Sequence, residues 1–115
     1  MQRVYSEHGI TVPFKATATT IIRYQEQYGR DLLVDLKKNE DAAKSGETLS
    51  TEILHIFMKF AHTMAKQADP TIVGDYFEWI DQFEVFPITE LMPWLMQLWI
   101  DSNVPTAELQ KKAEA

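Results

Sequence analysis

The segment Leu91-Met-Pro-Trp-Leu-Met-Gln-Leu-Trp-Ile100 is the most apolar stretch of the chain. Read as a helix, it carries apolar side chains over more than half of its circumference, and only Glu90, Gln97 and Asp101 form a polar stripe. A helix on the surface of a globular domain needs an apolar arc of roughly 100°. The sequence therefore predicts either that the rest of the domain surrounds this helix or that a partner covers part of it.

Length and charge restrict the classes of protein to consider. The 115 residues predict one domain over 1–103, followed by a flexible C-terminal tail over 104–115, where small and charged side chains prevail. The net charge of −6 disfavours binding to nucleic acid or to an anionic membrane. The longest apolar run contains Pro93 and is far shorter than the roughly 20 residues that span a bilayer. We expect neither nucleic acid nor membrane as a partner.

The absence of cysteine excludes disulfide bonds, thiolate chemistry and thiolate-bound metal. The first residues also lack the apolar core of a secretory signal peptide. These two features fit a protein of the reducing cytosol, so we expect an intracellular location.

Alternation of apolar and polar residues predicts extended structure near the N-terminus. Ile10, Val12 and Phe14 alternate with polar residues and Pro13, which is the pattern of a half-buried strand. Val4-Tyr5 is the expected partner strand, with a turn over 6–9. Because proline lacks an amide donor, Pro13 suits an edge strand.

The remaining chain shows helical periodicity. Ile21, Tyr24, Tyr28, Leu32 and Leu36 share one face, which Ile22 and Leu33 widen. Gly29 is a suitable left-handed C-terminal residue and Asp31 a suitable N-cap, which favours two helices, although one continuous helix would keep the same phase. We predict helices over 18–28, 31–39, 50–68, 71–83 and from an N-cap at Thr89 to Asn103, with Pro93 in the first turn of the last one and a loop over 39–48. The predicted fold is mainly α, with about five helices and a small N-terminal β-hairpin, which is α+β by strict count.

No constellation of catalytic side chains stands out. His55 and His62 lie two turns apart on a predicted polar helix face with Lys59 between them, which is a poor metal site and a typical solvated face. No serine occurs in a Gly-x-Ser-x-Gly turn, and four glycines cannot form a phosphate-binding loop. We therefore expect that the protein is not an enzyme and that it binds neither a metal nor a cofactor.

A row of carboxylates, Asp75, Glu78 and Asp81, follows the polar side of its predicted helix. Catalysis would need one of them buried with a raised pKa. An exposed face is the simpler interpretation, and the alternative is an acidic docking stripe for a basic partner.

The tryptophan and methionine side chains of the apolar helix admit two interpretations, core packing or partner contact. Methionine adapts to varied apolar partners at low strain, and an uncovered tryptophan leaves a large apolar area in water. If this helix contacts a partner, the candidate contact residues are Met92, Trp94, Leu95, Met96 and Trp99.

Three blocks of sequence, within residues 14–36, 60–71 and 77–83, carry a resemblance to a known family. Their most specific parts are Tyr28-Gly-Arg-Asp31, Met64-Ala-Lys-Gln-Ala-Asp-Pro70 and the helix around Trp79. In this order they resemble the tail assembly chaperones of long-tailed bacteriophages and prophages of Gram-positive bacteria, over roughly residues 10–101. The segment Val73-Gly-Asp-Tyr76 departs from the shorter turn expected there.

The resemblance implies a function without catalysis. Such chaperones bind the tape-measure protein, a long apolar helical rod, in the cytoplasm of the bacterial host. They keep it soluble until tail-tube subunits displace them, they self-associate, and they are not part of the virion. An adaptable apolar surface with weak contacts repeated along the rod would suit this role.

Two further points stay open at the level of sequence. Many members of the family also exist in a longer form made by ribosomal frameshifting, and Gln110-Lys111-Lys112 can be encoded by a slippery A-AAA-AAG run. The alternative to the chaperone is a small phage-encoded adaptor or inhibitor that docks one-to-one on a host protein. Stoichiometry distinguishes the two, because a chaperone of this kind binds its long partner in many copies.

Overall fold

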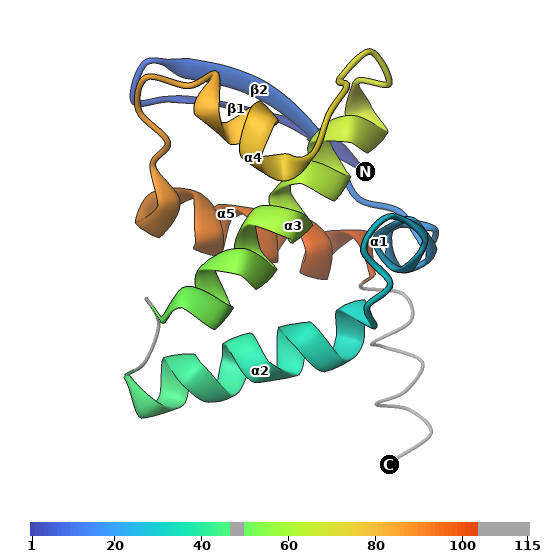
Figure 1. The fold of residues 1–115 in the computed structure, drawn as a ribbon, viewed down its shortest axis with the longest axis vertical. Helices are drawn as coiled ribbons and strands as arrows, with labels where there is room; N and C mark the ends of the chain where they lie inside the picture. Colours follow the sequence, from blue (N-terminus) through green and yellow to red (C-terminus); the bar gives the residue numbers. More distant parts are fainter. Residues whose placement is uncertain (47–49, 104–115) are drawn as a thin grey trace.

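The structure, a computed structural model that describes residues 1–46 and 50–103, begins with an antiparallel hairpin (Figure 1). β1 (Gln2–Glu7) pairs with β2 (Ile10–Lys15), and His8 and Gly9 connect them. Both turn residues have positive φ, 53° and 80°, as a two-residue type I′ turn requires. The predicted hairpin is therefore confirmed, but its turn is shorter than the predicted 6–9, because Ser6 and Glu7 belong to β1.

Five helices follow within the described residues, so the prediction of a mainly helical fold with a small hairpin is confirmed. They are α1 (Thr20–Tyr28), α2 (Leu32–Ser45), α3 (Thr51–Ala68), α4 (Tyr76–Asp81) and α5 (Ile88–Ser102). In Figure 1, α2 lies at one end of the molecule, the hairpin and α4 lie at the other, and α3 runs between them.

The core forms around α3, which packs against β2, α1, α2 and α4. Its buried side chains include Phe57, Phe60 and Met64, which belong to one apolar cluster with the inward residues of the hairpin and of α5. Phe60 meets Trp99 of α5 edge-to-face, with ring centroids 6.0 Å apart. This helix is therefore buried from several sides and organises the core.

Capping residues separate α1 from α2, as the sequence predicts. Gly29 has a left-handed φ of 66°, and its amide donates to the carbonyl of Gln25. The carboxylate of Asp31 then accepts from the amides of Leu33 and Val34. The two-helix alternative is thus the correct one.

The predicted loop over 39–48 is wrong for most of its length, because α2 continues to Ser45. Two ion pairs at i,i+4 spacing support the extra turns, Lys37–Asp41 at 3.2 Å and Glu40–Lys44 at 3.0 Å. Ala42 is buried in a small cluster with two isoleucines of α3. The segment looked like a loop because its contact with the core depends on a single small side chain.

The predicted start of α4 is also wrong. The sequence places it at residue 71, whereas the helix begins at Tyr76 and is capped by Asp75, whose carboxylate accepts from the amide of Glu78 at 2.9 Å. Gly74 precedes the cap with a φ of 88°, which interrupts any helix that starts earlier. The departure from the family pattern at residues 73–76 coincides with this delayed start.

The start of α5 differs from the prediction as well. Its N-cap is Pro87 and not Thr89, whose hydroxyl instead donates to Glu90 within the first turn. Pro93 consequently lies in the second turn, where it removes the bond that its amide would have made to the carbonyl of Thr89. Pro93 is exposed, so water can satisfy that carbonyl. The predicted tail over 104–115, with the proposed frameshift site, lies outside the described residues.

Candidate partner-binding surface

The five residues predicted to contact a partner do not share one surface. Leu95 is fully buried, and Trp99 is 9% exposed. Met92, Trp94 and Met96 are half-buried. Leu95 therefore belongs to the core, which corrects its assignment as a contact residue. Trp99 exposes only a small part of its side chain to a partner.

Trp94 packs against the hairpin of its own domain. Its ring meets Tyr5 edge-to-face at 5.3 Å between centroids and Phe14 at 5.7 Å. Paired aromatic rings in this geometry contribute about 1 kcal/mol beyond the area that they bury. Trp94 thus joins α5 to the hairpin, and its role as a partner contact is secondary to this one.

An apolar groove lies between α2 and α5, and we call it the α2–α5 groove. Its volume is about 590 Å³, and Met96 and Trp99 of the predicted set belong to its wall. Leu33 and Ile100 stand on its two sides with 55% and 51% of their surfaces exposed. The lining residues are Leu33, Leu36, Lys37, Asn39, Glu40, Ala43, Met96, Trp99 and Ile100.

Charges along the α2 side of this groove are paired with each other. Lys37 bonds to Asp41, and Glu40 bonds to Lys44, whose ammonium holds the pKa of Glu40 below its ordinary value. Both pairs are exposed to solvent, so they contribute little to stability. The groove accordingly presents apolar surface with a balanced polar rim, which suits an apolar partner of either net charge.

Sequence reasoning missed the residues that α2 contributes to the groove. It assigned Leu33 and Leu36 to the buried face of their helix, and Leu33 is exposed. The signal was present in the run Leu32-Leu33-Val34, because three consecutive helical positions span about 200° and cannot all face one core. Only Leu32 is buried. Ile22, which was expected to widen the same face, is likewise exposed.

The predicted solvated face of α3 is wrong at His62, which is buried, and the adjacent Thr63 is buried as well. Nδ1 of His62 lies within hydrogen-bonding distance of the hydroxyl of Tyr28 and of the amide nitrogen of Gln27. The other nitrogen, Nε2, is buried without a hydrogen-bond partner among the described residues. The face is polar because it packs against α1 through hydrogen bonds.

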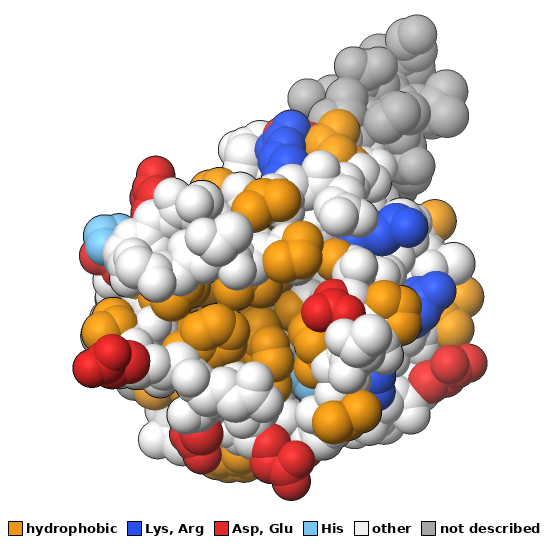
Figure 2. Space-filling model, turned by 90° about the horizontal axis from the view of Figure 1, so that it is seen from above, with side chains coloured by type: hydrophobic (Ala, Val, Ile, Leu, Met, Phe, Trp, Pro, Cys, Tyr) orange, Lys and Arg blue, Asp and Glu red, His pale blue; other side chains and the backbone are white. Residues whose placement is uncertain are grey.

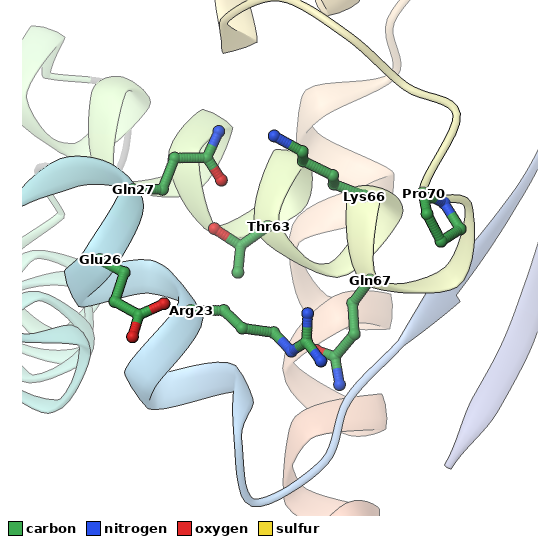
Figure 3. A pocket seen from close by; sticks show the side chains of 7 residues that line it. All are labelled: Arg23, Glu26, Gln27, Thr63, Lys66, Gln67 and Pro70. Atoms are coloured by element: carbon green, nitrogen blue, oxygen red, sulfur yellow. The ribbon is translucent and has the colours of Figure 1, made fainter.

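A polar pocket of about 450 Å³ opens between α1 and α3 (Figure 3). Gln67 is held at its edge, because its amide group bonds to the hydroxyls of Thr17 and Thr20 at 2.6 and 2.8 Å. The other lining residues are Arg23, Glu26, Gln27, Thr63, Lys66 and Pro70. The hydroxyl of Thr63 donates to the carbonyl of Lys59, so it is not activated as a nucleophile. The lining residues in the described part of the chain form no nucleophile–base pair.

The acidic residues Asp75, Glu78 and Asp81 are all exposed, as an acidic surface stripe requires. No group of three or more His, Asp or Glu side chains suited to a metal occurs among the described residues. None of the helices in residues 1–46 and 50–103 combines the length and apolar character needed to cross a bilayer.

Comparison with protein-family models, with curated proteins and with solved structures found no match to this chain.

Proposed function

We propose that this protein is a tail assembly chaperone of a long-tailed bacteriophage or prophage. In this role it binds the tape-measure protein and keeps it soluble during tail morphogenesis, in the cytoplasm of the bacterial host, and it is not part of the virion. The observation that supports the proposal is the α2–α5 groove, an open apolar channel between two helices. The resemblance of residues 14–36, 60–71 and 77–83 to this family supplies the identity of the partner.

A groove between two helices accepts a third helix, whose apolar face replaces the water that covers the channel. Met96 gives the wall an adaptable side chain, so that different stretches of one long rod can fit the same site. The groove has room for a few side chains of a partner, which gives a weak contact per copy. Several copies along one rod then add their affinities through avidity.

Weak individual contacts also fit the last step of assembly. Tail-tube subunits must displace the chaperone, and a copy held by one small contact dissociates faster than a copy held by an extensive interface, so the copies can be displaced one at a time. Self-association of neighbouring copies would reinforce coverage of the rod without strengthening any single contact.

Co-expression with the tape-measure protein of the same phage or prophage tests the proposal. We expect the tape-measure protein to be soluble with this chain and to precipitate without it, and we expect light scattering to show many copies per rod. A tape-measure protein that is equally insoluble in both cultures contradicts the proposal. Saturation at one copy per partner would favour the adaptor or inhibitor instead.

A further inference from the structure

A second hollow lies between β2 and α4, at the end of the molecule away from α2, and we call it the β2–α4 hollow. It consists of two cavities of about 350 and 490 Å³ that share Thr11, Gln82 and Phe83 in their walls. Figure 2 looks onto this end and shows apolar side chains on the floor of a hollow. Val12, Trp79 and Phe83 are among the lining residues.

Two exposed valines border the apolar floor of the β2–α4 hollow. Val73 of the loop before α4 is 77% exposed and lines one cavity, and Val85 after α4 is 57% exposed and lines the other. Exposed apolar side chains that are contiguous with an apolar floor indicate a site that is covered in a complex.

The wall of the hollow includes an unpaired strand edge. The backbones of Met1 and Ala16 exchange both hydrogen bonds, at 2.6 and 2.9 Å, and antiparallel pairs alternate between bonded and non-bonded. In the observed register Thr11 is therefore a non-bonded position, so its amide and carbonyl point away from β1. Neither group has another backbone partner among the described residues.

Pro13 occupies the next outward-facing position on this edge, opposite Val4. It offers a carbonyl but no amide. The part of the edge that lines the hollow therefore presents one complete donor–acceptor pair, at Thr11, followed by one acceptor, and the next outward-facing position, Lys15, lies outside the lining. Within the hollow, an added strand can make two backbone hydrogen bonds to one residue only at Thr11, so Pro13 restricts the register of pairing there.

The charges around the hollow have one sign. Among the described residues, its lining contains the carboxylates of Asp69 and Glu84 and the imidazole of His8 but no lysine or arginine. Figure 2 shows acidic side chains around the apolar floor. A partner with positive charge beside its apolar residues is complementary to this surface.

We propose that the β2–α4 hollow binds an extended segment of a protein partner that alternates apolar residues with lysine or arginine. The segment pairs with the outer edge of β2 at Thr11, inserts its apolar side chains over Trp79 and Phe83, and places its cations near Asp69 and Glu84. This site faces away from the α2–α5 groove, so it does not depend on the proposed function.

A capped heptapeptide of alternating lysine and valine is the probe. We expect it to bind with an affinity about tenfold higher than the same peptide with glutamate in place of lysine, measured by calorimetry at low salt. Binding should slow hydrogen exchange of the Thr11 amide in NMR spectra. A peptide N-methylated at alternate residues should lose binding because it cannot donate to the edge.

Two pairs of protein variants separate the pairing from the charge. Thr11→Pro removes the outward amide without touching the backbone bonds of the β1–β2 ladder. Thr11→Ala is its control, because it also removes the hydroxyl that bonds to Ser6 but keeps the amide. We expect Thr11→Pro to bind the peptide about tenfold more weakly than Thr11→Ala. Glu84→Lys should weaken binding severalfold, whereas Glu26→Lys on α1, with the same change in net charge, should not.

Several results would overturn the proposal. The first is equal affinity of the protein for the lysine and glutamate peptides. The second is equal affinity of the two Thr11 variants for the lysine peptide, together with no effect of Glu84→Lys. The third is chemical-shift changes on peptide binding that are confined to α2 and α5. A helical conformation of the bound peptide would also contradict it, because a helix cannot pair with a strand edge.

Discussion

The hydroxyl of Tyr28 hydrogen-bonds to Nδ1 of the buried His62. The side-chain nitrogen of Gln27, which can only donate, lies 3.1 Å from the same Nδ1, so Nδ1 is an acceptor and the Tyr28 hydroxyl donates to it. With two donors directed at Nδ1, the neutral tautomer of His62 carries its proton on Nε2. Protonation of Nδ1 would place a third N–H donor against the two donors from Tyr28 and Gln27. The folded protein therefore favours the neutral imidazole of His62.

This arrangement makes stability depend on pH. Burial lowers the pKa of His62 below its ordinary value and Lys66 lowers it further, against a small opposite effect of Asp75. The unfolded chain therefore binds a proton near pH 6.5 that the folded chain does not. The contribution is complete above that pH and is lost as pH falls below it.

We expect the free energy of unfolding to be lower at pH 5.5 than at pH 7.5 by up to about 1.4 kcal/mol, because the unfolded histidine is protonated about one pH unit above the lower value. Urea titrations at both values measure the change. His62→Gln should remove most of the difference, whereas His8→Gln on the exposed hairpin turn should retain it. A wild-type protein of equal stability at both pH values would contradict the prediction.

A second buried group, Asp35, connects α1 and α2. Its carboxylate accepts from the hydroxyl of Tyr24 and from two nitrogens of Arg30, each at 2.7 Å. Burial alone would raise the pKa of Asp35, but the bonds from Arg30 and Tyr24 outweigh it and hold the pKa below its ordinary value. Arg30 comes from the segment Tyr28-Gly-Arg-Asp31, so this segment stabilises the fold.

We expect Asp35→Asn to lower the free energy of unfolding by about 3 kcal/mol, because it leaves the guanidinium of Arg30 without its carboxylate. Asp41→Asn is the matched control on the same helix. Its exposed pair with Lys37 should contribute less than about 0.5 kcal/mol. Denaturant titrations compare the two, and similar losses in both variants would contradict the assignment.

The fold could be predicted from the sequence wherever local chemistry determined it. Gly29 and Asp31 end one helix and begin the next through their own backbone and side-chain preferences, and the period of β2 identifies its buried face. The end of α2 could not be predicted, because Ala42 packs against isoleucines that lie on another helix. Such a contact leaves almost no pattern in the sequence.

The candidate site was predicted in part for the same reason. The α5 segment was recognised as a helix with excess apolar surface, and Met96 and Trp99 do line a groove. Leu95 could not be distinguished from them, because the direction of a helix face depends on which neighbours pack against it. The opposite wall, from α2, depends on a tertiary arrangement that periodicity does not contain.

Trp94 provides a prediction that separates packing from binding. Because its ring contacts Tyr5 and Phe14, we expect Trp94→Ala to lower the free energy of unfolding by about 3 kcal/mol. Trp94→Leu keeps apolar volume and should cost less. Val73→Ala, at an exposed position, should change stability by less than about 0.5 kcal/mol. Equal stability of Trp94→Ala and the wild type would mean that this ring does not hold the hairpin.

The α2–α5 groove can be tested with one pair of isoleucines. Ile100 borders the groove and is 51% exposed. Ile22 on α1 is 54% exposed and lies outside the α2–α5 groove, the β2–α4 hollow and the polar pocket between α1 and α3. An aspartate at either position is tolerated by the fold, because each side chain is already half in water. At position 100, however, a partner helix would have to desolvate the new carboxylate, which costs more than the lost apolar contact.

We therefore expect Ile100→Asp to reduce the yield of soluble tape-measure protein in co-expression at least fivefold, which corresponds to a loss of about 1 kcal/mol per contact. Ile22→Asp should leave that yield unchanged. Circular dichroism and thermal melting of both variants show whether each is folded before the yields are compared. Equal yields from the two folded variants would exclude the α2–α5 groove as the binding surface. Equal losses would point to a general effect of added charge, because the two substitutions differ only in their place on the surface.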